Sequence, residues 1–194
     1  MLKNLYLPFL IMLLFGYSSC FKQDEQIANK APIKDSTIIM AKDLSTDKNG
    51  LSHDSIVIKT ARGNIEFKVY PEKAPNTVTR IIELVNKGFY DGIKFHRVHP
   101  NFVIQAGDPT GTGTSGSGKM LKAEFNDVQH IKGTVAMART QDPDSADSQF
   151  YIALTTLPHL DGKYTVFGQV VKGLDVIDKV QKDDVIVSMV FKRK

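Results

Sequence analysis

The stretch from residue 94 to residue 108 places one arginine and one glutamine among apolar residues. Arg97 stands in Phe-His-Arg-Val, and Gln105 stands in Val-Ile-Gln-Ala. A guanidinium among apolar neighbours rarely serves packing alone, and its charge does not titrate near neutrality. It can act as a fixed cation and hydrogen-bond donor, but not as a general acid or base. The pattern therefore favours chemistry that stabilises a transition state by electrostatics.

Two short strands must position these side chains. The segments around Arg97 and Gln105 are both runs of β-type residues, and Pro100-Asn101 supplies a turn between them. Such a hairpin holds polar side chains on a rigid sheet, which suits a binding or catalytic site. His96, next to the arginine, is interpreted as a structural histidine rather than a base.

The glycine-rich segment 107–118 is similar to two nucleotide-binding motifs. Gly111 to Gly116 spells a dinucleotide fingerprint, and Gly113 to Lys119 nearly spells a phosphate loop. Both motifs need a helix that starts directly at the glycines, whereas Ser, Gly and Lys continue a loop here. Met120 also stands where a phosphate loop has Ser or Thr. We expect tight backbone turns here and no nucleotide binding.

No metal or other cofactor is expected. Asp142, Asp144 and Asp147 lack the spacing and the closing glutamate of an EF-hand loop. The five histidines show no HExxH or comparable ligand spacing. The net charge of +4 is spread along the chain, so nucleic acid is not an expected partner.

The chain from residue 53 to residue 194 predicts a mainly β domain. Residues 56–60 and 65–70 form a predicted hairpin, and apolar residues recur at helical spacing between Pro75 and Gly88. Further strands are predicted at 133–139, 148–154, 164–171 and 185–191, with a short helix around 176–180. Eight strands with two helices and no βαβ alternation favour a closed eight-stranded antiparallel barrel.

Several motifs, in order, resemble the signature of the cyclophilins, which are peptidyl-prolyl cis-trans isomerases. The motifs are Phe95-His96-Arg97-Val98, Phe102 to Asp108, Gly133 to Ala138, Ser148 to Ile152, Leu160 to Lys163 and Val166 to Gly168. They extend over roughly the last three quarters of the chain. The fold that the resemblance implies is a barrel with a helix over each open end, in agreement with the pattern of elements.

The resemblance also implies an active site for X-Pro segments of proteins. It implies catalytic roles for Arg97, Phe102 and Gln105. It implies substrate contacts by Val103, Ala138, Arg139, Gln149, Tyr151, His159, Leu160 and Tyr164. Four of these differ from the usual family residues: Val103 replaces Met, Tyr151 replaces Phe, His159 replaces Trp and Tyr164 replaces His. The added hydroxyl of Tyr151 needs a partner or a water molecule.

The leading hypothesis is therefore a monomeric peptidyl-prolyl cis-trans isomerase that assists the folding of exported proteins without a cofactor. Its partners would be proline-containing segments of client proteins. The alternative is a module on the same barrel that holds proline peptides, or acts as a chaperone, without turnover. The presence of Arg97, Phe102 and Gln105 favours the enzyme, since a pure binder has less need of the cation.

The first 52 residues predict export and attachment to a membrane. Lys3 precedes an apolar run, Leu5 to Phe15, that is shorter than the ~20 residues needed to span a bilayer. Ser18-Ser19-Cys20 resembles the lipobox of bacterial lipoproteins, which implies a signal peptide over 1–19 and a lipid on Cys20. An ordinary cleaved signal with an incidental thiol is the alternative.

Residues 20–52 are polar and aperiodic, which predicts a flexible tether of roughly 30 Å. We expect the domain of residues 53–194 to be held in this way in the bacterial cell envelope, in the periplasm or at the surface.

Overall fold

The computed structural model describes residues 54–193. The predicted signal peptide (1–19), Cys20 and the predicted tether (20–52) lie outside the described residues. Within residues 54–193, no helix combines the length and the apolar character that crossing a membrane requires.

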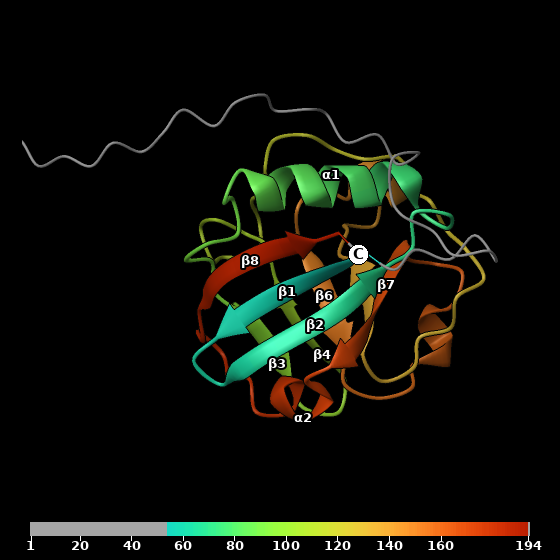
Figure 1. Cartoon of the computed structure of the whole chain (residues 1–194). Helices are drawn as coiled ribbons and strands as arrows, with labels where there is room; N and C mark the ends of the chain where they lie inside the picture. The colour runs from blue at the N-terminus through green and yellow to red at the C-terminus, as the bar shows by residue number, and fades with distance from the viewer. Residues whose placement is uncertain (1–53, 194) are drawn as a thin grey trace, which may run out of the picture. The chain divides into compact units, whose positions relative to one another are not determined.

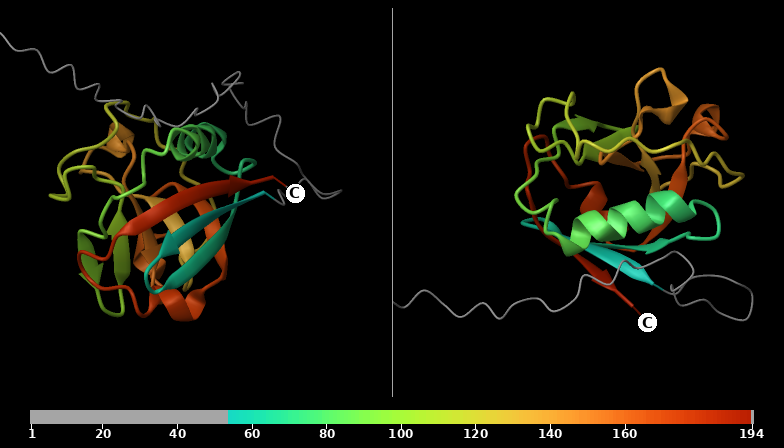
Figure 2. Two further views of the ribbon diagram at one scale, coloured as in Figure 1. Left: turned by 60° about the vertical axis from the view of Figure 1, so that its left-hand side comes forward. Right: turned by 90° about the horizontal axis from the view of Figure 1, so that it is seen from above.

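Eight antiparallel strands form one curled sheet (Figures 1 and 2). The strand order is β3-β4-β6-β5-β7-β2-β1-β8, so β3 and β8 are its two edges. The strands are β1 (Ser55–Thr60), β2 (Gly63–Val69), β3 (Arg97–His99), β4 (Val103–Ala106), β5 (Thr134–Met137), β6 (Phe150–Ala153), β7 (Val166–Lys172) and β8 (Ile186–Lys192). The predicted strands are all present, with ends that differ by one or two residues.

The sheet is open, so the prediction of a closed barrel is wrong. In the described part of the chain, no ladder pairs β3 with β8. The segments that lead into these strands meet instead: Lys94 and Val185 form an isolated bridge, and Ile186 N donates to Ile93 O at 2.8 Å. β3 has only three residues and begins beyond this bridge. β3 is therefore too short to form a ladder with β8.

Two α-helices lie at opposite ends of the curled sheet (Figure 1). Helix α1 (Pro75–Asn86) confirms the predicted amphipathic helix, because Val78, Ile81, Ile82 and Val85 are all buried. Helix α2 (Leu174–Ile177) is a single turn that buries two of its residues. Two short 3-10 helices, η2 (Pro143–Ser145) and η3 (Pro158–Leu160), lie in loops.

Alternate residues of the central strands face two different clusters. Ile104, Val135 and Ile152 belong to the main core of the sheet. Val103 and Tyr151, one position away from Ile104 and Ile152, belong to a second, smaller cluster. Because side chains alternate along a strand, one set of strands serves both clusters. Phe102, Leu160 and Tyr164 pack against the second cluster and leave it partly open.

The N-terminus of α1 is capped by a residue from a distant loop. Ala74, at the N-cap, has no side chain that could accept a hydrogen bond. The carboxylate of Glu124 instead accepts from the backbone N–H groups of Asn76 at 3.0 Å and Thr77 at 2.8 Å, and from both of their side chains. It satisfies free amides and places a negative charge at the positive end of the helix dipole.

We expect Glu124→Gln to lower the free energy of unfolding by about 1 kcal/mol, because the charge is lost from the cap. Urea denaturation at neutral pH measures this. Glu72→Gln removes an equal charge from an exposed residue just before the helix and should change stability by less than about 0.5 kcal/mol. Equal losses in the two variants would contradict the capping role.

Candidate active site

Strand register brings four positions into one row on the face of the second cluster. Arg97 pairs with Gln105 across β3 and β4, and Gln105 pairs with Tyr151 across β4 and β6. Tyr151 pairs in turn with Ala136 across β6 and β5. Directly opposed residues have Cβ atoms about 5 Å apart. The register therefore sets a cation, an amide and a phenol ring side by side.

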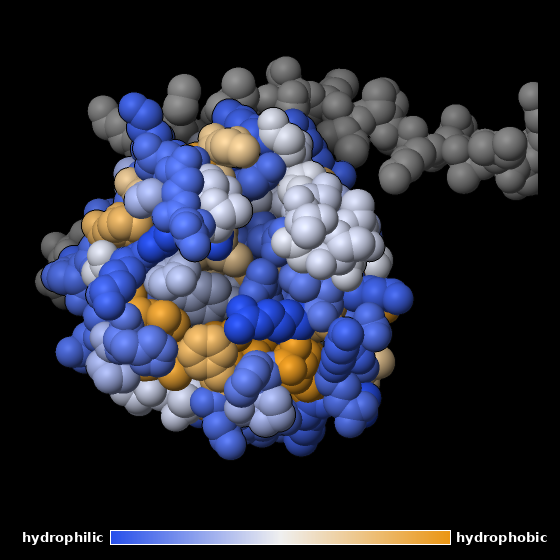
Figure 3. All heavy atoms as spheres, turned by 180° about the vertical axis from the view of Figure 1, so that it is seen from behind, coloured by the Kyte–Doolittle hydropathy of each residue, from blue (hydrophilic) through white to orange (hydrophobic). Residues whose placement is uncertain are grey.

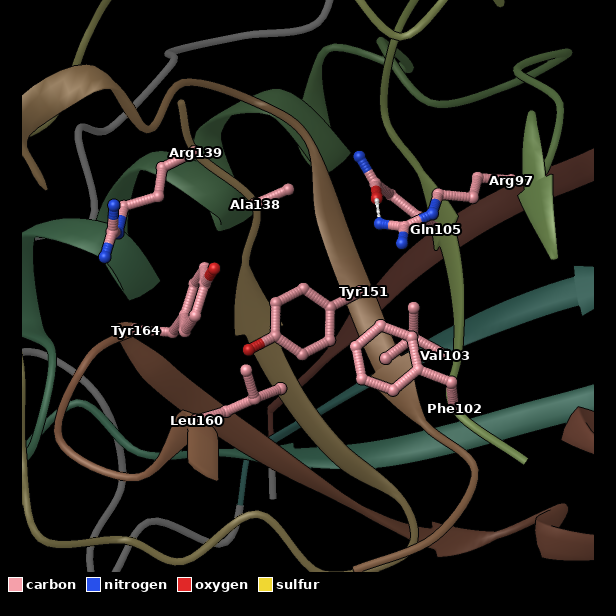
Figure 4. A pocket seen from close by; sticks show the side chains of 9 residues that line it. All are labelled: Arg97, Phe102, Val103, Gln105, Ala138, Arg139, Tyr151, Leu160 and Tyr164. Atoms are coloured by element: carbon pink, nitrogen blue, oxygen red, sulfur yellow. Dashed lines mark hydrogen bonds between the residues drawn. The ribbon is translucent and has the colours of Figure 1, made fainter. Parts of the chain in front are cut away.

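A pocket of about 160 Å³ opens over this row (Figure 4). Arg97 and Gln105 lie on one side of it, Arg139 and Tyr164 lie on the opposite side, and Tyr151 lies between them. The lining residues are Arg97, Phe102, Val103, Gln105, Ala138, Arg139, Tyr151, Leu160 and Tyr164. Figure 3, which views the molecule from behind, shows a hollowed face on which apolar and hydrophilic side chains adjoin. All nine lining residues are among the sequence-predicted site residues.

The guanidinium of Arg97 is exposed and is not neutralised by a carboxylate. Nη1 donates to Gln105 Oε1 at 3.3 Å, and the guanidinium carbon lies 5.7 Å from the centroid of the Phe102 ring. In the part of the chain that the structure describes, Arg97 takes part in no ion pair. Its other N–H groups are therefore available to a ligand.

A chain of side-chain amides orients Gln105. Its oxygen accepts from Arg97, so its nitrogen faces the other way and donates to Gln149 Oε1 at 2.9 Å. Gln149 Nε2 donates in turn to the carbonyl oxygens of Gly113 at 3.1 Å and Ser115 at 2.8 Å. Gln149 thus lies behind the pocket wall, where it ties Gln105 to the glycine-rich loop.

Phe102 is placed by the tight turn between β3 and β4. Asn101 has a φ of 58°, and Phe102 N donates to His99 O at 3.1 Å. His159 does not line the pocket, but its ring stacks on Phe102 with centroids 6.1 Å apart and planes 10° apart. Of the predicted substrate contacts, Gln149 and His159 therefore support the lining from outside.

The opposite wall is built around Arg139. Its guanidinium carbon lies 4.6 Å from the centroid of the Tyr164 ring. Its Nε and Nη2 groups both donate to Lys163 O, at 3.1 and 2.9 Å. Further bonds to the carbonyl oxygens of Thr140 and Gln141 use up much of its donor capacity. The family resemblance implies a substrate contact at Arg139, and in the structure its side chain forms one wall of the pocket.

Two residues behind Tyr151 were missed by the sequence analysis. The hydroxyl of Tyr151 lies 2.9 Å from His130 Nε2, and His130 Nδ1 lies 2.9 Å from Asp161 Oδ1. Burial, the largest effect, raises the pKa of Tyr151 far above its ordinary value. The signal in the sequence was the hydroxyl itself, which needs a partner when Tyr replaces Phe.

Asp108 organises the glycine-rich loop. Its carboxylate accepts from the backbone N–H groups of Thr110, Gly113 and Ser115 and from the hydroxyl of Thr110. Burial alone would raise the pKa of Asp108, but the hydrogen bonds from Thr110, Ser115 and Gly113 outweigh it and hold the pKa well below its ordinary value. His96 packs against this loop, with ring atoms 3.5 Å from the position that a Cβ on Gly113 would take.

No helix begins within residues 107–118, in agreement with the interpretation of the glycines as loop residues. Among the described residues, no group of three or more His, Cys, Asp or Glu side chains is arranged to hold a metal ion.

Residues 55–192 match the family model described as cyclophilin type peptidyl-prolyl cis-trans isomerase/CLD. A peptidyl-prolyl cis-trans isomerase of Helicobacter pylori is 44% identical over 138 residues, which cover 69% of this chain and 84% of that protein. Peptidyl-prolyl cis-trans isomerase B of Bacillus subtilis is 47% identical over 124 residues, which cover 63% of this chain and 86% of that protein.

Solved structures show the same similarity. A crystal structure of a cyclophilin type peptidyl-prolyl cis-trans isomerase from Cryptosporidium parvum matches with a TM-score of 0.68 and 27% identity, covering 73% of this chain and 98% of that chain. A second crystal structure of that protein, in the presence of the dipeptide Ala-Pro, matches with a TM-score of 0.68 and 26% identity, covering 72% of this chain and 99% of that chain.

We expect Asp108→Asn to lower the free energy of unfolding by about 2 kcal/mol at pH 7. An amide cannot accept all of the hydrogen bonds that the Asp108 carboxylate receives from the glycine-rich loop. The folded pKa lies below the unfolded value of about 3.9, so the carboxylate stabilises the protein above that pH. This contribution is lost as the pH falls towards the folded pKa. Urea denaturation should therefore show a smaller difference in the free energy of unfolding between wild type and variant at pH 3 than at pH 7.

Asp183→Asn is the matched control, because Asp183 is exposed and lies 4.0 Å from its lysine partner. It should change stability by less than about 0.5 kcal/mol at either pH. If the free energies of unfolding of wild type and Asp108→Asn differ as much at pH 3 as at pH 7, the lowered pKa of Asp108 does not contribute to stability as proposed.

Proposed function

Because this chain belongs to the cyclophilin-type peptidyl-prolyl cis-trans isomerases, we propose that its X-Pro substrate binds in the pocket between Arg97 and Tyr164. The chain is a peptidyl-prolyl cis-trans isomerase, and the proposal concerns which residues carry the reaction. The observation that supports it most strongly is the unneutralised guanidinium of Arg97 beside apolar side chains.

The reaction sets the requirements for the site. Rotation about the X-Pro bond breaks amide resonance, which costs roughly 18–20 kcal/mol, and without a catalyst it takes tens to hundreds of seconds. In the twisted transition state, the proline nitrogen regains a lone pair that the planar amide had delocalised. A donor aimed at this nitrogen binds the transition state more tightly than the ground state, and such differential binding raises the rate.

Arg97 is the proposed donor. Its charge is permanent, its planar group offers several N–H donors, and Gln105 holds it beside the pocket. No proton needs to be removed and no covalent bond needs to form. The site therefore requires neither a nucleophile nor a cofactor.

The other lining residues grip the substrate. Phe102, Val103, Tyr151 and Leu160 offer apolar contact to a proline ring. The volume of about 160 Å³ suits one small side chain rather than a large ligand. The backbone near Ala138 and Arg139 would pair with the flanking peptide, so that one side of the bond is held while the other rotates.

We also propose that the domain acts outside the cytoplasm as a lipid-anchored monomer that assists the folding of exported proteins. The support is the Lys3-led apolar run, the Ser18-Ser19-Cys20 sequence and the polar segment 20–52. On this proposal, residues 1–19 are removed, Cys20 carries the lipid, and the tether holds the domain clear of the membrane of the cell envelope.

Arg97→Lys should lower kcat/KM on an Ala-Pro peptide by on the order of 10²-fold, because lysine keeps the charge but not the planar fork of donors. A protease-coupled assay measures this. Arg62→Lys is the matched control. Arg62 is exposed, lies in the β1–β2 turn, pairs with Asp184 before β8, and is not among the pocket residues. It should leave kcat/KM within about twofold of wild type.

A wild-type rate equal to those of Arg97→Lys and Arg97→Ala would favour a non-catalytic proline-binding module. A wild-type rate well above both supports the enzyme.

Labelling with a radioactive fatty acid tests the anchor. Wild-type protein made in a bacterial host should incorporate label, and Cys20→Ser should incorporate none, because the lipid is attached to that thiol. Label that is absent from the wild type, or that is equal in both proteins, would remove the lipoprotein proposal.

A further inference from the structure

Tyr151 carries a hydroxyl next to the proposed proline site, and the structure gives that hydroxyl a buried partner. His130 lies in the loop before β5 and is fully buried, with 0% of its surface exposed. Its Nε2 lies 2.9 Å from the hydroxyl oxygen of Tyr151. In Figure 4 this hydroxyl points away from Arg97, towards the side of the pocket where Leu160 lies.

Asp161 determines which ring nitrogen of His130 carries the proton. The carboxylate Oδ1 accepts from His130 N at 2.7 Å and lies 2.9 Å from His130 Nδ1. The hydrogen bond from the His130 backbone, which has the larger effect, and the one from its ring both lower the pKa of Asp161. The carboxylate is therefore ionised and can only accept hydrogen bonds. In the neutral ring, Nδ1 is then the protonated nitrogen and Nε2 is the acceptor. With the ring neutral, the hydroxyl of Tyr151 therefore donates its hydrogen bond to Nε2 of His130.

Ring contacts surround this hydrogen bond. The His130 ring lies nearly parallel to the Tyr151 ring, with centroids 6.0 Å apart and planes 17° apart. Tyr164, on the other wall of the pocket, meets Tyr151 edge to face at 5.7 Å and 85°, and meets His130 at 6.4 Å and 79°. The three rings form one cluster, within which one hydrogen bond joins Tyr151 to His130.

We propose that His130, oriented by Asp161, is a positioning residue that fixes the Tyr151 ring as the surface on which the substrate proline rests. The inference rests on the proposed function, because it takes the pocket over Tyr151 as the proline site. His130 does not touch the substrate. It acts by holding the ring at one angle and by keeping the hydroxyl proton away from the pocket.

Removing the acceptor should loosen the pocket. In His130→Leu, the hydroxyl of Tyr151 remains buried without a partner, which favours a movement of the ring towards the pocket or the solvent. The Kd for an Ala-Pro peptide should rise by on the order of tenfold. The value of kcat should change by less than about threefold, because Arg97 stays in place and uniform binding affects mainly KM.

The double variant His130→Leu/Tyr151→Phe separates positioning from general stability. It removes the hydroxyl together with its acceptor, so no polar group is left unpaired. Its Kd should return to within about threefold of that of Tyr151→Phe alone. A role in stability alone would lower the melting temperature of His130→Leu without moving the Kd of the folded protein.

Nitrogen NMR on the wild-type protein tests the geometry without relying on a variant that could fail to fold. His130 Nδ1 should give the shift of a protonated nitrogen and Nε2 that of an unprotonated one, and Tyr151→Phe should move the Nε2 signal. A proton on Nε2, or a Kd that is unchanged in folded His130→Leu, would overturn the proposal.

Peptide titration separates this failure from that of the proposed function. Binding that perturbs the Tyr151 ring but does not depend on His130 overturns the positioning role alone. A peptide that binds without perturbing Tyr151 overturns the proposed proline site and the positioning role with it.

Discussion

The site depends above all on strand register. Arg97, Gln105, Tyr151 and Ala136 are consecutive partners across β3, β4, β6 and β5, so they lie in one row. A slip of one residue at any of these pairings would turn the displaced side chains to the other face of the sheet. The main core holds the register, because Ile104, Val135 and Ile152 from the same strands are packed there.

Two networks hold the walls of the pocket in position. On the Arg97 side, side-chain amides connect Gln105 to Gln149 and to the glycine-rich loop, which Asp108 orders. On the other side, aromatic rings and Arg139 form a rigid cluster. Rotation about a peptide bond needs a grip and one directed donor rather than a proton relay. Fixed side chains on a sheet are well suited to that task.

The sequence predicted the parts of this molecule that depend on local pattern. The spacing of Val78, Ile81, Ile82 and Val85 located α1, and alternation located the strands, although their ends shifted by one or two residues. Closure of the barrel was predicted wrongly. It depends on how far β3 extends beside β8, and a three-residue strand has too little pattern to reveal this. The resemblance to cyclophilins identified the lining residues, whose functional roles stay predictions.

Contacts between distant segments could not be predicted. Glu124 caps a helix whose first turn lies 47 and 48 residues earlier, and His130 finds its partners 21 and 31 residues later. Nothing in the local sequence of either residue indicates its partner. The resemblance showed that the hydroxyl of Tyr151 needed a partner, but only the tertiary structure identified it.

Catalysis by this site requires that Arg97 stabilises the twisted amide more than the planar one. Exchange NMR on an Ala-Pro peptide tests it directly, because one experiment gives both the Kd and the rate of cis-trans exchange on the protein. For Arg97→Ala, the exchange rate should fall by on the order of 10²-fold while the Kd changes by no more than a few-fold. An exchange rate equal to that of the wild type, or a loss explained wholly by a weaker Kd, would contradict the account.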